Sequence, residues 1–302
     1  AGTIYIKDNS SDYDKLIISN PAIDHYDSNL TTLFNGEYSF NEIVLTQKGG
    51  LEITDGVDIT VTDSFNPTGD FYLKHRSAGS LSYPTPFDLT TTGNVIIEDS
   101  NNNLSFNNLT VNSGTTTLEG TFTLQDLTVH AGDMFLRGEI TANNAILNND
   151  FTIETNNSSF KGFTVNSGTT TLNGNLTVED VTINNTATLT HLPNTNQQTN
   201  YLILNAHNIT ISENASLDVS AKGYAATFGQ GAGSSGSLGG GGGGHGGNGG
   251  ASSGGTAGGQ SYGNYTDPQY IGSGGGNDSS TGSPGGSGGG YVRLNISNKL
   301  DI

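Results

Sequence analysis

Apolar residues recur every 18 positions between residues 104 and 190, in two registers. The first register consists of short alternating triplets: Leu109-Thr110-Val111, Leu127-Thr128-Val129, Ala145-Ile146-Leu147, Phe163-Thr164-Val165 and Val181-Thr182-Ile183. The second register keeps the same step: Leu104/Phe106, Phe122/Leu124, Ile140, Phe160 and Leu176/Val178. A fixed period of this kind is typical of a solenoid, in which each coil stacks on the next and shares its core.

Turn residues keep the same period as the apolar registers. One column contains Gly114, Gly132, Asp150 and Gly168, and the other contains Asn102, Gly120, Gly138, Asn156 and Gly174. Gly, Asn and Asp are the residues that tolerate a left-handed backbone. The repeat therefore predicts alternating strands and turns.

Eighteen residues divide naturally into three short sides, each a strand followed by a turn. This division predicts an all-β parallel β-helix, with inward aliphatic residues stacked from coil to coil and outward Thr and Asn facing water. A left-handed hexapeptide helix has the same coil length, but it needs one aliphatic residue at every sixth position. Here apolar pairs at i and i+2 flank each turn, so we predict the right-handed form, with about 18 residues per coil.

The pattern changes along the chain, and it divides the protein into four zones. Residues 1–100 predict an irregular start of the solenoid with long loops, and residues 101–221 predict regular coils. Residues 222–290 form a glycine-rich excursion, and residues 291–302 predict a strand that returns to the solenoid. No amphipathic helical pattern of useful length is present.

Glycine supplies 30 of the 69 residues between positions 222 and 290. Such a composition is typical of a flexible linker. It also suits a bundle of polyglycine II helices, because close-packed backbones with three residues per turn leave no room for side chains. Large side chains that could anchor such a bundle are confined to a few positions: Tyr224, Phe228, Tyr262, Tyr265, Tyr270 and Ile271.

Residues 205–302 resemble the glycine-rich insertions of large secreted surface proteins. The resemblance rests on the run from Gly239 to Gly250, on Gly272-Ser273-Gly274-Gly275-Gly276, and on Gly288-Gly289-Gly290-Tyr291-Val292-Arg293-Leu294. It implies an insertion that leaves and re-enters a parallel β-helix. The tract is also similar in texture to the polyglycine bundles of a springtail antifreeze protein and of phage adhesin tips. Its irregular phase and its lack of cysteine depart from the springtail pattern, so ice binding is not carried over.

Composition limits the size of the core and indicates where the protein is located. Only 32% of the residues are hydrophobic, which is enough for a thin core shared between coils. The chain has no cysteine and no apolar run long enough to cross a bilayer. We expect an extracellular or cell-surface protein that is not inserted in a membrane. The chain opens at Ala1-Gly2, which we interpret as a processed or excised end.

The formal charge is −18, from 28 acidic and 10 basic residues. Nucleic acid is excluded as a partner, because phosphate binding needs clustered Lys and Arg. An acidic surface keeps copies soluble by mutual repulsion and could recruit calcium. We expect no other cofactor.

A polysaccharide-degrading enzyme needs clustered acids with a basic residue nearby, and the basic residues of this chain are sparse. The candidate acids are Asp55, Asp58 and Asp63, or Asp126 and Asp180 in one turn column with Asn144; the candidate bases are the cluster Lys74-His75-Arg76 and Arg137. Acids at solenoid turns usually stabilise the backbone, and no known catalytic motif is present. We therefore expect no catalytic and no metal-binding residues, and no enzyme.

The two ends of the chain carry a similar strand, turn and strand. Residues 2–7 parallel residues 290–295, and residues 14–18 parallel residues 298–302. Strand edges at the ends of a solenoid invite pairing with another chain. The expected assembly residues are Thr3, Ile4, Tyr5, Ile6, Tyr291, Val292, Leu294, Leu300 and Ile302.

These observations predict a structural protein: a surface fibre, a stalk or a self-stacking filament subunit. Its expected partners are further copies, head to tail, or neighbouring tandem modules. The alternative is an adhesin or carbohydrate-binding surface module that contacts cell-surface glycans through the Thr and Asn ladders and the aromatic loops around residues 62–92.

Overall fold

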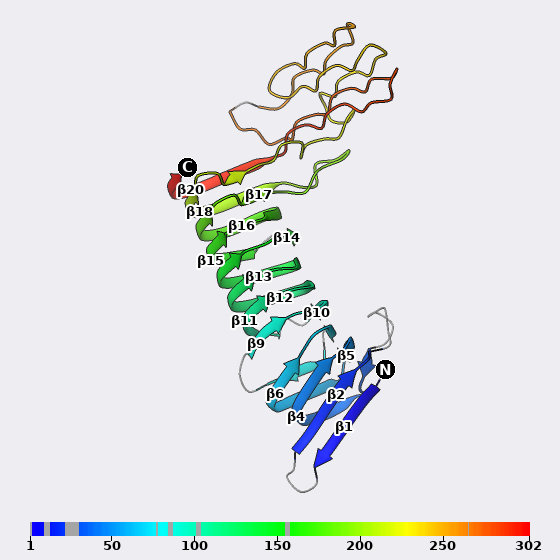
Figure 1. Ribbon diagram of the computed structural model, residues 1–302, viewed down its shortest axis with the longest axis vertical. Coiled ribbons are helices and arrows are strands. Elements are labelled where there is room, and N and C mark those ends of the chain that lie inside the picture. The colour runs from blue at the N-terminus through cyan, green and yellow to red at the C-terminus, as the bar shows by residue number, and fades with distance from the viewer. Residues whose placement is uncertain are drawn as a thin grey trace.

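A computed structural model describes residues 2–8, 13–21, 30–76, 78–83, 87–100, 104–154, 158–264 and 266–302. Within these residues the protein contains strands and no helix. They form a parallel β-solenoid of about 7 turns, topped at its C-terminal end by the glycine-rich segment (Figure 1). The predicted all-β parallel solenoid is confirmed.

One side of the solenoid, here the first side, is a stack of parallel strands. Seven short strands and the starts of three long ones build it. Its members are β3 (Thr31–Thr32), β5 (Gly49–Ile53), β7 (Phe71–His75), β10 (Val95–Asp99), the starts of β12 (Thr115–Val129), β13 (Asp133–Leu147) and β16 (Thr169–Ile183), and β14 (Phe151–Glu154), β17 (Thr188–Thr190) and β19 (Ser216–Leu217).

The second and third sides are formed largely by long strands that bend from one side to the next. These are β4 (Gly36–Thr46), β6 (Val57–Pro67), β12, β13, β15 (Ser158–Val165), β16, β18 (Leu202–Ile211) and β20 (Val292–Asp301). The shorter β8 (Ser80–Ser82) belongs to the second side, and β2 (Tyr13–Ser19), β9 (Phe87–Thr91) and β11 (Phe106–Val111) belong to the third.

Breaks in the alternation of buried and exposed residues mark the corners of each coil. Along β12 the alternation fails at residues 119–121 and again at residues 125–126, where consecutive side chains face outward. Gly120, Gly138 and Gly174 occupy the first corner with positive φ angles of 131°, 148° and 105°. A Cβ on Gly138 would lie 2.0 Å from the carbonyl oxygen of Gly120, so stacked corners require glycine here. Asn102 and Asn156, predicted for the same column, lie outside the described residues.

The 18-residue period holds in the middle of the chain. Thr115 pairs with Asp133, Thr141 with Ser159, and Phe163 with Val181. Earlier coils are longer, since 24 residues separate Phe71 from its partner Val95. Insertions at the corners absorb the difference while the inward positions keep their partners.

The core is a narrow column inside the three sides. Apolar residues of both predicted registers are buried, including Leu109, Phe122, Ile140 and Phe163, each at most 2% exposed. Four phenylalanine rings follow one another along the axis, with centroids 5.3, 5.2 and 6.0 Å apart: Phe65, Phe87, Phe106 and Phe122. Each coil therefore depends on its neighbours for burial.

Two excursions leave the corner between the first and second sides of the last coils. Residues 191–200 form a loop, and residues 223–290 form the glycine-rich lobe. Buried Asn194 joins them, because its amide donates 2.9 Å hydrogen bonds to the carbonyl oxygens of Asn200 and Lys222. After the lobe, β20 pairs in parallel with β18, and Leu202 lies opposite Val292.

The lobe is built from backbone hydrogen bonds between its extended runs. Four neighbouring runs are linked by the amide groups of Gly272, Gly275, Gly276 and Gly242, which donate to Gly289, Gly286, Gly241 and Gly250 at 2.8–2.9 Å. Many glycines have no room for a side chain: a Cβ on Gly259 would lie 1.8 Å from the carbonyl oxygen of Gly231. Ile271 is fully buried, whereas Phe228 and Tyr270 are exposed. Tyr265 lies outside the described residues.

The two ends of the chain are built differently, so the prediction that they carry the same element is wrong. β1 (Gly2–Asp8) runs antiparallel to β2 on one side of the solenoid. β20 instead bends across two sides and runs parallel to β18. Their sequences share only the alternation of a half-buried strand, which does not specify strand direction.

Candidate functional site

The N-terminal assembly residues lie on β1, the outermost strand at that end. Thr3 pairs with Ile18 and Tyr5 with Leu16, so these two side chains share the core-facing side of the sheet with buried neighbours. Ile4 and Ile6 point to the opposite side and are 54% and 45% exposed. Among the described residues, β1 pairs only with β2, so its outer edge is open.

An apolar pocket of about 430 Å³ opens beside β1. Leu16, Leu33, Tyr38 and Phe40 contribute to its lining, and the ring of Tyr5 meets that of Phe40 edge to face at 6.0 Å. This pocket is the mouth of the solenoid at its N-terminal end.

The C-terminal assembly residues lie on or next to β20. Val292 and Leu294 are half-buried, whereas Leu202 and Leu204, their partners one coil earlier, are fully buried. Leu300 and Ile302 are 44% and 87% exposed, and Tyr291 precedes the strand at the edge of the lobe. Within the described chain β20 pairs only with β18. The last coil thus presents apolar side chains and an unpaired strand edge.

Basic residues that could have served catalysis are paired with acids of neighbouring coils. Lys74 lies 2.6 Å from Glu98, Arg76 lies 2.6 Å from Glu52, and Arg137 contacts both Glu119 and Glu154. Burial raises the pKa of Glu98, but hydrogen bonds from Lys74 and Tyr72 outweigh it, and the pKa lies below its ordinary value.

Histidine 75 and Asp99 form a buried pair between two coils. The Nδ1 atom of His75 lies 3.0 Å from Asp99 Oδ1, and its Nε2 atom lies 3.0 Å from the carbonyl oxygen of Gly79. The other carboxylate oxygen of Asp99 accepts the Leu104 amide at 2.8 Å. Neither side chain reaches the surface, so this pair is an internal contact between two coils.

The acids singled out at the turns also serve as contacts between coils. Asp55 accepts the Ala78 amide, Asp58 accepts the Ser80 hydroxyl, and Asp63 accepts the Asn41 side chain. Asn144 and Asn208 each donate a 2.7 Å hydrogen bond to the acid of the preceding coil, which is Asp126 for the first and Asp180 for the second. These acids are distributed along the solenoid and do not converge on one pocket.

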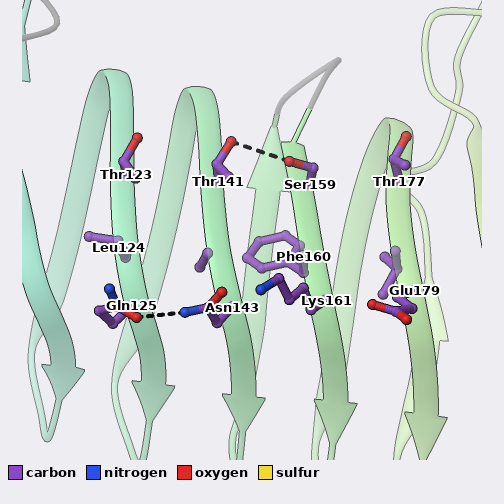
Figure 2. A pocket seen from close by; sticks show the side chains of 12 residues that line it. Thr123, Leu124, Gln125, Thr141, Asn143, Ser159, Phe160, Lys161, Thr177 and Glu179 are labelled. Atoms are coloured by element: carbon purple, nitrogen blue, oxygen red, sulfur yellow. Dashed lines mark hydrogen bonds between the residues drawn. The ribbon is translucent and has the colours of Figure 1, made fainter.

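A shallow groove of about 560 Å³ runs along the corner between the second and third sides (Figure 2). Its floor consists of four inward residues, and its walls are two rows of polar residues that repeat at the coil period. The floor is Leu124, Ala142, Phe160 and Val178; one row is Thr123, Thr141, Ser159 and Thr177, and the other is Gln125, Asn143, Lys161 and Glu179.

Within each row, some neighbouring side chains are hydrogen-bonded to each other and others have no such bond. Thr141 and Ser159 share a 3.2 Å hydrogen bond, and Asn143 donates to Gln125 at 2.6 Å (Figure 2). The sequence predicts outward Thr and Asn ladders but carries no signal for the groove. The polar residues were visible at positions 125, 143, 161 and 179, but the concave corner between them was not.

A histidine fixes the junction between the lobe and the solenoid. His191 is buried, its Nδ1 atom lies 2.7 Å from the carbonyl oxygen of Leu192, and its Nε2 atom accepts the backbone N–H of Tyr291 at 3.1 Å. The proton must therefore sit on Nδ1. Burial lowers the pKa of His191, although the Leu192 carbonyl opposes this effect.

No protein-family model, curated protein or solved structure matches this chain, so its geometry alone carries the functional argument. Among the described residues, no cluster of three or more His, Asp or Glu side chains is placed to hold a metal ion. In the same residues, no helix long and apolar enough to cross a membrane occurs. The expectations that the protein has no cofactor and is not an enzyme remain predictions.

Proposed function

We propose that this protein is an extracellular structural element, a surface stalk or fibre subunit that associates with further copies through its ends. The observation that carries the proposal is the open edge at each end of the solenoid, on β1 and on β20. Apolar side chains accompany both edges, with Ile4 54% and Leu300 44% exposed. Edges of this kind are templates for pairing with another chain.

The shape supports the same role. The coils form a straight column, and the end of β20 lies across the last coil from the lobe (Figure 1). A second copy can approach the edge formed by residues 299–301 from that direction. Head-to-tail contacts produce fibres when the rotation between successive copies does not close a ring.

The glycine-rich lobe is interpreted as a polyglycine II-like bundle. The hydrogen bonds between its runs and the lack of space for side chains support this interpretation. A location outside the cell is in keeping with the absence of cysteine and with the acidic surface, and the handedness of the solenoid remains a prediction.

Sedimentation velocity at increasing protein concentration, with negative-stain microscopy, tests the proposal. Wild-type protein should form elongated oligomers. Ile4→Lys and Leu300→Lys should each weaken association at least about tenfold, because each places a desolvated charge at the contact. Ile146→Lys is the matched control, since Ile146 is 37% exposed on the third side, away from both ends.

A wild-type protein that remains monomeric at every concentration would overturn self-association. Equal weakening by Ile146→Lys would show that association uses the flank of the column and not its ends.

A glycan-binding surface module is the second candidate function. The groove between the second and third sides favours it, because polar side chains repeat there over four coils above an apolar floor. Concave sites with a few convergent polar groups are the usual place for ligands.

A further inference from the structure

We infer that the groove along residues 123–125, 141–143, 159–161 and 177–179 binds an extended, uncharged polysaccharide strand parallel to the solenoid axis. The inference rests on the second candidate function. It does not depend on self-association.

The spacing of the groove matches a linear polymer. Equivalent side chains in neighbouring coils are one strand spacing apart, about 4.8 Å. This distance is close to the length of one sugar ring in an extended chain. Four coils line the groove, so four consecutive sugar units would each meet one hydroxyl-row residue and one residue of the Gln125–Asn143–Lys161–Glu179 row.

The chemistry of the walls favours sugar over peptide. A peptide binds a sheet by adding a strand to a free edge, where it gains main-chain hydrogen bonds. In the groove, the strands β12, β13, β15 and β16 are already paired with the coils on either side. What remains available is side-chain hydroxyl, amide, amine and carboxylate groups, which are suited to a ligand rich in hydroxyl groups.

Free polar groups remain after the internal contacts of the groove are formed. In the described part of the chain, no hydrogen bond or ion pair engages the side chains of Thr123, Lys161, Thr177 or Glu179. They provide both donors and acceptors on the two walls of the groove. Thr123 and Thr177 stand at opposite ends of the hydroxyl row, and Lys161 and Glu179 belong to the other row.

The charges of the groove favour an uncharged ligand. Its walls contain one cation, Lys161, and one anion, Glu179, while the whole chain carries a net charge of −18. A polyanion would be repelled by the chain as a whole without a cationic row to compensate it. The floor residues Phe160 and Leu124 are each 4% exposed, so the ligand would be held mainly by the two polar rows.

Affinity electrophoresis and calorimetry with linear glucans, mannans and xylans test this inference, with polygalacturonate as the charged comparison. We expect at least one neutral polymer to bind, with affinity that rises with oligomer length up to about four units, one for each groove coil. Thr141→Trp should fill the groove and weaken binding at least about tenfold. Thr171→Trp is the matched control, because Thr171 is a partly exposed threonine on the first side.

Each other outcome counts against a different part of the inference. If neither a neutral polymer nor polygalacturonate binds wild-type protein, both the inference and the glycan-binding candidate fail. If a polymer binds and Thr141→Trp binds it as well as Thr171→Trp does, the groove assignment fails and the candidate function stands. Preference for polygalacturonate would overturn the assignment of an uncharged ligand.

Discussion

At the scale of single residues, glycine does two different things in this protein. At the solenoid corner, Gly138 has a φ of 148° and no space for a Cβ, which would meet the Gly120 carbonyl oxygen. In the lobe, Gly286 has open space around the position of a Cβ and no positive φ. Residue identity is thus dictated by packing at the first position and not at the second.

This difference predicts unequal costs for the same substitution. Gly138→Ala should destabilise the solenoid by about 3 kcal/mol or more, because it combines a left-handed backbone with a clash against main-chain atoms. Gly286→Ala should change stability by less than about 0.5 kcal/mol. Urea unfolding followed by circular dichroism measures both. Equal costs for the two variants would contradict this account of the corner.

His191 is also a residue-scale feature, and it makes the junction of lobe and solenoid sensitive to pH. Its Nε2 atom accepts the Tyr291 N–H only while the ring is neutral. Because burial lowers its pKa below the ordinary value of 6.5, the unfolded chain binds the proton more tightly. The contribution of His191 to stability is therefore complete above the unfolded pKa and is lost as pH falls below it towards the folded pKa.

Thermal unfolding between about pH 8 and pH 5 should show this loss around the ordinary His pKa of about 6.5. His191→Gln should reduce that pH dependence. His130→Gln is the control, since His130 is exposed on the solenoid surface. A wild-type pH profile unchanged by His191→Gln would contradict the assignment.

At the scale of elements, each strand is stabilised by the coils on either side of it. The row of Phe65, Phe87, Phe106 and Phe122 crosses four coils, and the ion pairs of Lys74 and Arg76 join coils 24 residues apart. Exposed ion pairs contribute little individually, whereas burial of aromatic rings contributes more.

Removing an aromatic ring should therefore destabilise the protein more than removing an ion pair, although both contacts join neighbouring coils. Phe106→Ala should cost about 3–5 kcal/mol, because it leaves a cavity between two rings. Arg137→Ala should cost less than about 1 kcal/mol, since Arg137 is half-exposed and its ion pairs are screened. Denaturant midpoints measure the difference. A larger cost for Arg137→Ala would show that ion pairs dominate the stack.

At the scale of the whole molecule, net charge opposes the association proposed above. Every copy carries −18, and the apolar residues at the ends must overcome that repulsion.

Salt should therefore strengthen self-association. Raising NaCl from about 0.01 M to about 1 M shortens the Debye length from about 30 Å to about 3 Å, which removes most of the repulsion between copies. We expect the weight-average sedimentation coefficient to rise. A decrease with salt would instead indicate that attractive ion pairs hold the copies together.

Much of the architecture was predictable from the sequence because it repeats locally. The inward columns through Leu109 and Phe122, the 18-residue step and the glycine corners all follow from residue spacing, since period and turn chemistry are short-range properties. The assembly residues could also be placed at the two ends. Their function remains a proposal.

Tertiary structure decided the features that depend on distant contacts. The antiparallel direction of β1, the pairing of Lys74 with Glu98, and the hydrogen bond from Tyr291 to His191 across 100 residues have no local signal. The groove belongs to the same class. Its polar rows could be recognised from the repeat. The rows face a common hollow only because each coil bends at the corner that residues 125–126 form in β12, and packing against the neighbouring coils sets that bend.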